Sequence, residues 1–178
     1  MKEKVIAVVG AGIMGSDVSF DLASHNYNVI LKDLREEYLQ KAEERIRKNF
    51  KLMKLTKKDF SADTVDGIIS RIKFITDYAG FENADFLLEN INENFELKKK
   101  LFLELKDVCT KDTIFGSNTS CISITKIGAL MPHPDNVIGM HFLNPIPLKN
   151  LVEVIRGFHT SDETVEKTKG FLRSDQMR

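Results

Sequence analysis

Near its start the chain reads Val5-Ile-Ala-Val-Val-Gly-Ala-Gly-Ile-Met-Gly15, an apolar run that leads directly into a Gly-x-Gly-x-x-Gly turn. The run is typical of a strand buried on both faces, so we expect a strand at residues 4–9. The first glycine permits a tight turn, the second lets the backbone approach a pyrophosphate, and the third allows close packing of helix on strand. A helix expected at 13–25 would then direct its free N–H groups and positive dipole end toward the phosphates.

The acid Asp33 strengthens this interpretation. A second strand is expected at 28–32, and Asp33 follows Gly15 at close to the spacing of about 20 residues where a carboxylate accepts from the adenosine ribose. A carboxylate there repels a 2′-phosphate, which favours NAD over NADP, although Arg35 could soften that preference. We therefore expect the bound cofactor to be NAD, held by Gly10, Gly12, Ile13, Met14, Gly15 and Asp33.

Strand-length apolar runs alternate with helical periods along the chain, which predicts an α/β fold with a doubly wound, mostly parallel sheet, the Rossmann arrangement. One domain is expected over residues 1–178, with a helix-turn-helix arm at about 36–70 and an extra hairpin at the end. Ser61 or Asp63 is expected to cap the second helix of the arm, and Ser161 the last helix. Beyond those above, strands are expected at 72–75, 85–91, 113–117, 137–142 and 151–155, and helices at 36–55, 61–69, 97–109 and 162–172.

The composition excludes several classes of partner. The 26 basic and 26 acidic residues balance, so no overall field would gather nucleic acid or an anionic membrane. The short, glycine-rich apolar run at the start resembles a buried strand more than a signal peptide, and no stretch approaches a membrane span. The only cysteines, Cys109 and Cys121, lie outside CxxC or Cys/His patterns, so we expect a cytoplasmic protein without disulfides or bound metal.

Polar residues follow the later strands, where parallel strands bring their carboxyl ends to one edge. His141 ends one expected strand and Glu153 lies in the next, so the two could form a dyad. The carboxylate would orient the imidazole, and the imidazole would take a proton from an alcohol. From spacing alone, a histidine that serves only as a structural hydrogen-bonding group remains the open alternative.

Taken together, these segments resemble the L-3-hydroxyacyl-CoA dehydrogenase family, which includes bacterial 3-hydroxybutyryl-CoA dehydrogenases, over essentially the whole chain. The resemblance implies oxidation or reduction of the 3-hydroxyl or 3-keto group of a short-chain acyl thioester, with hydride exchanged with the nicotinamide. It is carried by several motifs in the family's order, namely the glycine turn and residues 85–98, 117–125, 139–147 and 151–155.

The resemblance also implies roles for individual residues. His141 corresponds to the catalytic base and Glu153 to its paired carboxylate. Ser120 and Asn144 correspond to polar residues that hold the substrate oxygen and the nicotinamide end. Ser120 is thus expected to contact both cofactor and substrate, although its hydroxyl could instead cap the short helix that follows.

Four charged positions complete the implied sites. Glu93 and Lys98 correspond to residues that line the NAD site, although Glu93 could be a solvated acid and Lys98 an exposed partner of Asn94. Lysines near the end of the long helix, Lys54 and Lys57 among them, would approach the CoA phosphates. Those lysines could equally be a solvated helix end that complements the dipole.

The chain departs from the family pattern in three respects. Members usually continue into a C-terminal helical domain that makes a homodimer, whereas this sequence stops at Arg178, so that domain is expected to be absent and dimer formation doubtful. Asn90 stands where a small residue is usual and could alter the cofactor contact. Cys121 replaces a serine and is expected to be a small buried group, not a reactive thiol.

Three other functions stay open at this point. Relatives in biosynthetic pathways act on acyl groups tethered to a carrier protein, which Asn90 would permit. Some relatives bind NAD without catalysis. Other β-hydroxyacid dehydrogenases share the first forty residues' pattern, but they would need a catalytic lysine where this chain has His141 followed by Asn144-Pro.

Overall fold

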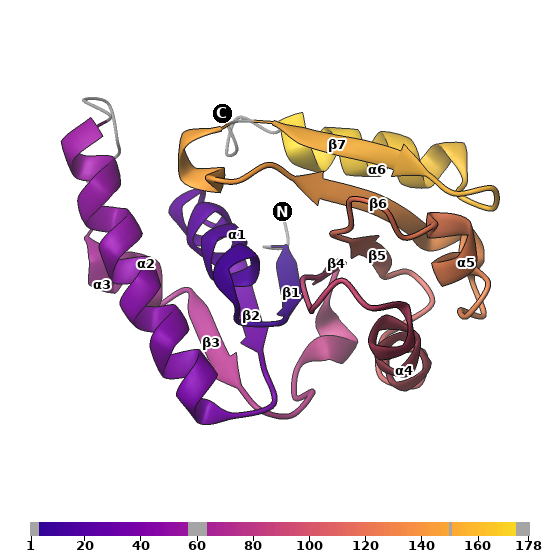
Figure 1. Cartoon of the computed structure of the whole chain (residues 1–178), viewed down its shortest axis with the longest axis horizontal. Helices are drawn as coiled ribbons and strands as arrows, with labels where there is room; N and C mark the ends of the chain where they lie inside the picture. The colour runs from indigo at the N-terminus through magenta and orange to yellow at the C-terminus, as the bar shows by residue number, and fades with distance from the viewer. Residues whose placement is uncertain (1–3, 57–63, 150, 174–178) are drawn as a thin grey trace.

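The computed structural model describes residues 4–56, 64–149 and 151–173. Seven strands form one sheet in the order β3-β2-β1-β4-β5-β6-β7, and helices cover both faces (Figure 1). The expected doubly wound α/β fold is therefore confirmed. The strands are β1 Val5–Val9, β2 Asn28–Lys32, β3 Ile72–Ile75, β4 Phe86–Glu89, β5 Ile114–Ser117, β6 Val137–Phe142 and β7 Val152–Arg156. The α-helices are α1 Ile13–Ser24, α2 Glu36–Thr56, α3 Val65–Ile69, α4 Phe95–Leu105, α5 Ile124–Gly128 and α6 Asp162–Arg173.

The order of the strands reverses at β1. The chain first adds β2 and β3 on one side, then crosses back and adds β4 to β6 in parallel on the other. Ligands of open parallel sheets bind outside the carboxyl ends of the strands at such a reversal. The glycine turn, which follows β1, lies at this position.

Two apolar cores explain why both faces are covered. One core joins β-strand side chains to α1, α2 and α6 through residues such as Val18, Ile46 and Phe171. The other joins the opposite side chains to α4 and α5 through residues such as Phe102 and Ile127. Because successive side chains of a strand point to opposite faces, the central strands are expected to be mainly apolar, and only their last residues, such as Glu89 of β4 and Ser117 of β5, are polar.

The last two strands form the extra hairpin expected from the sequence. β7 pairs antiparallel to β6, with His141 opposite Glu153 and Phe142 opposite Val152. The short 3₁₀ helix η3, Ile146–Leu148, lies in the connection between them, after a cis Asn144–Pro145 peptide bond. The register thus brings the two predicted dyad residues face to face on neighbouring strands.

The arm consists of two helices in contact. α2 packs along α1 (Figure 1). The ion pair from Arg47 to Asp66 at 3.0 Å joins α2 to α3. Thr64 caps α3 by accepting from the N–H of Gly67 at 3.0 Å. The expected caps Ser61 and Asp63 lie outside the described residues. At the last helix, Ser161 accepts from the Thr164 N–H, which confirms the cap expected there.

The boundaries of α4 differ from the expectation. The helix begins at Phe95, two residues earlier than expected, because the side chain of Asn94 caps it through the N–H of Leu97. Its buried face is made by Lys98 together with Leu101, Phe102 and Leu105, spaced i, i+3, i+4 and i+7. Leu97 lies one residue off that stripe and is half exposed, although periodicity alone would also place a leucine at this position on the buried side.

No helix among the described residues is long and apolar enough to cross a membrane.

Candidate active site

In the glycine turn, a side chain would clash at Gly10 and Gly15 but not at Gly12. Gly10 has φ +97°, and a Cβ there would lie 2.7 Å from the carbonyl oxygen of Asn90. A Cβ on Gly15 would lie 1.8 Å from the carbonyl oxygen of Gly10, so helix α1 could not pack so closely with any side chain there. At Gly12 nothing lies within 4 Å of such an atom, which leaves the backbone open to a ligand.

Asp33 lies beside this turn. Its Oδ2 accepts from the N–H of Ala11 at 2.6 Å, and its Oδ1 accepts from the N–H of Leu34 at 2.6 Å. The carboxylate therefore ties the end of β2 to the turn after β1. Each carboxylate oxygen has a second lone pair, so both oxygens can still accept from a ribose hydroxyl.

A buried charge cluster lies at the ends of β4 and β5. The Nζ of Lys98 donates to Glu89 Oε1 and Oε2 at 2.8 and 2.7 Å and to the carbonyl oxygen of Asn118 at 3.1 Å. It also lies 3.2 Å from Glu93 Oε2. Ser117 Oγ donates to Glu89 at 2.6 Å. Because Lys98 is fully buried, the alternative of an exposed partner for Asn94 is wrong.

Glu93 joins this cluster to the loop after β5. Its Oε1 accepts from the hydroxyl of Thr119 and from the backbone N–H groups of Ser120 at 3.0 Å and Cys121 at 3.3 Å. Partial burial acts to raise its pKa, but the hydrogen bond from Thr119 and the charge of Lys98 outweigh it and lower the pKa of Glu93 to about 2. Glu93 is thus a hydrogen-bonded carboxylate, and 35% of its side chain stays exposed.

The net pKa shift of Glu89 is in the opposite direction. Loss of hydration raises the pKa of Glu89, and the charge of Lys98 with the hydrogen bonds from Lys98, Ser117 and the Ile91 N–H only partly offsets it. The Lys98 charge thus acts against burial and favours the ionised form of the Glu89 carboxylate.

The expected dyad is present as a direct contact. His141 Nδ1 lies 2.7 Å from Glu153 Oε2. An ionised carboxylate only accepts, so Nδ1 carries the proton and the lone pair of Nε2 is left free to accept one. The His141 side chain is 24% exposed and that of Glu153 57%, so the imidazole remains accessible from outside.

Of the other predicted site residues, three lie on exposed or terminal segments and one is outside the described residues. Ser120 lies exposed in the loop held by Glu93, and the cap of α5 is Ser123 instead, which accepts from the Lys126 N–H at 3.4 Å. Asn144 is exposed three residues after His141, at the cis bond. Lys54 lies in the last turn of α2, with its ammonium 5.5 Å from the Phe50 ring centroid. Lys57 lies outside the described residues.

Sequence reasoning was wrong about Cys121 and gave no role to Asn118. Cys121 is exposed, because its loop turns outward around Glu93, and its Sγ lies 3.5 Å from Glu93 Oε1. Asn118 uses its side chain to bridge Asn90 and the N–H of Phe142, at 2.7 and 3.2 Å. The position of Asn118 directly after a strand was the available signal.

Comparison with known proteins identifies the family. A sequence model described as "3-hydroxyacyl-CoA dehydrogenase, NAD binding domain" matches residues 5–177. The chain belongs to this family. It is 40% identical over 157 residues to a probable 3-hydroxybutyryl-CoA dehydrogenase of Deinococcus radiodurans, covering 88% of this chain and 56% of that protein. It is 37% identical over 164 residues to a 3-hydroxyadipyl-CoA dehydrogenase of Escherichia coli, covering 92% and 34%.

A solved structure agrees with this assignment. The (S)-3-hydroxybutyryl-CoA dehydrogenase of Ralstonia eutropha superposes with a TM-score of 0.91 at 32% identity, covering 99% of this chain and 61% of that one. This chain of the 3-hydroxyacyl-CoA dehydrogenase family thus spans between about a third and three fifths of the relatives' lengths.

The residues of this NAD-binding domain fit its cofactor. The open backbone at Gly12, at the start of the 12-residue helix α1, suits a pyrophosphate, and Asp33 suits a ribose. The loop at Ser120, held by Glu93, lies past the ends of the strands where the nicotinamide end would reach. Among the described residues, no group of three or more His, Cys, Asp or Glu side chains could hold a metal ion.

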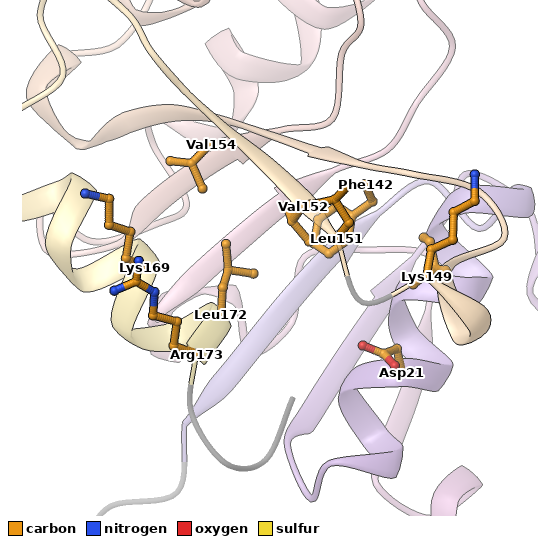
Figure 2. A pocket seen from close by; sticks show the side chains of 10 residues that line it. Asp21, Phe142, Lys149, Leu151, Val152, Val154, Lys169, Leu172 and Arg173 are labelled. Carbon is orange, nitrogen blue, oxygen red and sulfur yellow. The ribbon is translucent and has the colours of Figure 1, made fainter. Parts of the chain in front are cut away.

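A separate cavity of about 330 Å³ lies on the other face of the final hairpin. Figure 2 shows Phe142, Val152 and Val154 on its wall, with Lys149 and Arg173 at its edges. Since side chains alternate along a strand, His141 and Glu153 point to the opposite face from these three residues. The cavity is therefore not part of the dyad site.

Proposed function

We propose that the protein interconverts the 3-hydroxyl and 3-keto groups of a short-chain acyl-CoA thioester, with NAD as the redox partner. The observation that carries the proposal is the 2.7 Å contact between His141 Nδ1 and Glu153 Oε2 in a domain of the NAD-binding family. The names of the relatives, 3-hydroxybutyryl-CoA and 3-hydroxyadipyl-CoA dehydrogenases, support a 3-hydroxyacyl-CoA substrate.

His141 acts as the proton acceptor in this proposal. While the Nδ1–H group of His141 donates a hydrogen bond to Glu153, the free lone pair of Nε2 takes the proton of the 3-hydroxyl group as the 3-carbon is oxidised. The carboxylate holds the ring in one orientation and stabilises the imidazolium that forms. When bound, NAD supplies the acceptor for the hydrogen and electron pair that leave the 3-carbon. In the reverse direction His141 returns the proton to the oxygen.

The remaining polar residues have positioning roles in the proposal. Ser120 and Asn144, both exposed on loops that follow strands, would donate to the substrate oxygen or the nicotinamide end. Glu93 fixes the loop that carries Ser120. Lys54, with Lys57 beyond the described residues, would meet the CoA phosphates. Because Cys109 and Cys121 are free thiols, a reducing cytoplasmic location is part of the proposal.

In the test, the protein is mixed with acetoacetyl-CoA and NADH, and the loss of NADH absorbance is followed. His141→Gln is expected to lower kcat by at least about a hundredfold, the usual minimum contribution of a general acid–base group. Glu153→Gln keeps a side chain of the same shape but can present its amide nitrogen to the ring, so it is expected to lower kcat as well.

Three outcomes separate the alternatives. Turnover that depends on His141 supports the proposal. Turnover only when the acyl group is tethered to a carrier protein would replace CoA with that carrier. NADH binding by calorimetry without turnover on either thioester would instead favour a noncatalytic NAD-binding protein.

A further inference from the structure

We propose that Asn118 is a positioning residue for His141, acting together with Asn90 as an amide clamp across three strand ends. The clamp consists of the side chains of these two asparagines and the backbone groups of Leu88 and Phe142. The inference rests on the proposed function, because it concerns the placement of the imidazole that takes the proton. The contacts that carry it are independent of any substrate.

The need for the clamp comes from the pairing of β6. β5 pairs with β6 only through Gly139, whereas β6 continues to Phe142 alongside β7. On the β5 side, the N–H of Phe142 therefore lies past the last strand partner. Asn118 Oδ1 accepts from this N–H at 3.2 Å, so a side chain replaces the missing strand. The peptide group held in this way directly follows His141.

The direction of the amide is fixed by its other contacts. Asn118 Nδ2 donates to Asn90 Oδ1 at 2.7 Å, and Asn90 Nδ2 donates to the carbonyl oxygen of Leu88 at 3.3 Å. The series begins at a backbone carbonyl, which only accepts, and ends at a backbone N–H, which only donates. Flipping either amide would place like groups together at both of its ends, so only one orientation satisfies every group.

The backbone of Asn118 is held as firmly as its side chain. Its N–H donates to the carbonyl oxygen of Glu89 at 2.9 Å, and its carbonyl oxygen accepts from Lys98 Nζ at 3.1 Å. The buried cluster therefore anchors the clamp to β4, and the clamp transmits that position to the end of β6. His141 is then fixed from two sides, by Glu153 at its ring and by Asn118 at its following peptide.

Asn90 sharpens the proposal, because its Oδ1 is the acceptor for the Nδ2 of Asn118. Without an acceptor at position 90, the amide of Asn118 would have no partner for its Nδ2 on the β4 side. The clamp of this chain is thus a specific pairing of two amides, and either can be removed separately.

The first part of the test uses the chain without substrate. In Asn118→Ala, the amide of Phe142 is expected to exchange with solvent deuterium about five times faster or more, relative to Val8 in β1 as an internal reference. The NMR signal of the His141 Nδ1 proton is expected to broaden. Asn118→Asp keeps an acceptor for the Phe142 N–H and should change exchange less. Asn90→Ala only frees the orientation of the Asn118 amide, so the exchange rate of the Phe142 amide should lie between that of Asn118→Ala and that of the parent.

A matched control and a kinetic readout complete the test. Asn83→Ala removes an exposed asparagine before β4, at the opposite end of that strand, and should leave both NMR readouts unchanged. In turnover, Asn118→Ala should lower kcat about fivefold or more while the KM for NADH stays within about twofold. A merely structural role would instead leave kcat unchanged in the folded fraction.

Several results would overturn the clamp. Unchanged exchange at Phe142 in Asn118→Ala would show that the amide does not hold the strand end. Faster exchange with an unchanged His141 proton signal would show that it does not position the ring. If the parent protein shows no turnover, the proposed function fails, while the two NMR readouts still decide whether Asn118 positions His141. If Asn118→Ala does not fold, the same two NMR measurements are made on Asn90→Ala, and an unchanged exchange rate at Phe142 there would contradict the clamp.

Discussion

Lys98 Nζ lies 2.7 Å from Glu89 Oε2, and neither side chain is exposed to solvent. Two charges removed from water cost several kcal/mol each, and their attraction and hydrogen bonds must offset that cost. Here Ser117, the Ile91 N–H and the Asn118 carbonyl oxygen supply the additional hydrogen bonds. The pair therefore also fixes the ends of β4 and β5, where the loop that carries Ser120 begins.

Removing one member of this pair should destabilise the fold strongly. Lys98→Met leaves the Glu89 carboxylate buried without its partner, so we expect a loss of about 3–5 kcal/mol in the free energy of unfolding, measured with urea. The double variant Glu89→Gln/Lys98→Met removes both charges and should recover part of that loss. Equal stability of the single and double variants would contradict the interpretation that the two charges depend on each other.

Alanine substitutions at Gly12 and Gly15, the last two glycines of the turn, should affect the stability of the fold differently. In Gly15→Ala the new Cβ meets the Gly10 carbonyl oxygen at 1.8 Å, so we expect a loss of about 1–3 kcal/mol or more in thermal unfolding. In Gly12→Ala the Cβ meets nothing within 4 Å, so the fold should lose less than about 1 kcal/mol. NADH affinity, measured by fluorescence titration, should nevertheless fall in Gly12→Ala, because the methyl group occupies the pyrophosphate's approach. Unchanged affinity there would argue against this phosphate position.

Asp33 should determine the choice of dinucleotide. Asp33→Ala removes the ribose acceptor and the bond to the Ala11 N–H, so NADH affinity should fall by about 10- to 100-fold. Asp33→Asn keeps an oxygen for the Ala11 N–H but loses the charge that repels a 2′-phosphate. Calorimetric titrations with NADH and NADPH should therefore show a smaller difference for Asp33→Asn than for the parent. An unaltered ratio would remove Asp33 from cofactor selection.

Glu93 should make the protein sensitive to acid. Its pKa is about 2 when folded, against an ordinary value of 4.5. A carboxyl whose pKa is depressed by folding contributes stability that is fully present above about pH 4.5 and is lost as the pH falls toward 2. Urea unfolding of Glu93→Gln should therefore weaken less between pH 4.5 and 2 than that of the parent. Thr119→Val, which removes the hydroxyl donor, should shift the profile in the same direction, and superimposable profiles would contradict both.

Much of the fold could be predicted from the sequence, because the apolar runs are bounded by turn residues. The limits of β2, β3 and β6 agree with those expected, and α2 differs by one residue. The start of α4 could not be placed from periodicity, because Asn94 determines it by a local side-chain cap. Which of Leu97 and Lys98 is buried depends on partners from β4, and these are known only once the strands are assembled.

The site was predicted unevenly for the same reason. His141 and Glu153 were predicted to pair, and the antiparallel register brings them together. Asn118 was not predicted, since its value comes from Asn90 and Phe142, which are distant along the chain. Cys121 was expected to be a small buried group, whereas the path of the loop around Glu93 decides its exposure.

The hairpin that carries the dyad also differs from the cofactor site in how it would assemble. His141 and Glu153 are 12 residues apart, whereas β1 pairs with β4 across about eighty residues. Short loops close with less entropy loss and form faster, so the contact between His141 and Glu153 is expected to form before β1 pairs with β4. Opening of β1 and β2 in a partly unfolded chain would therefore abolish dinucleotide binding while leaving the imidazole and its carboxylate in contact.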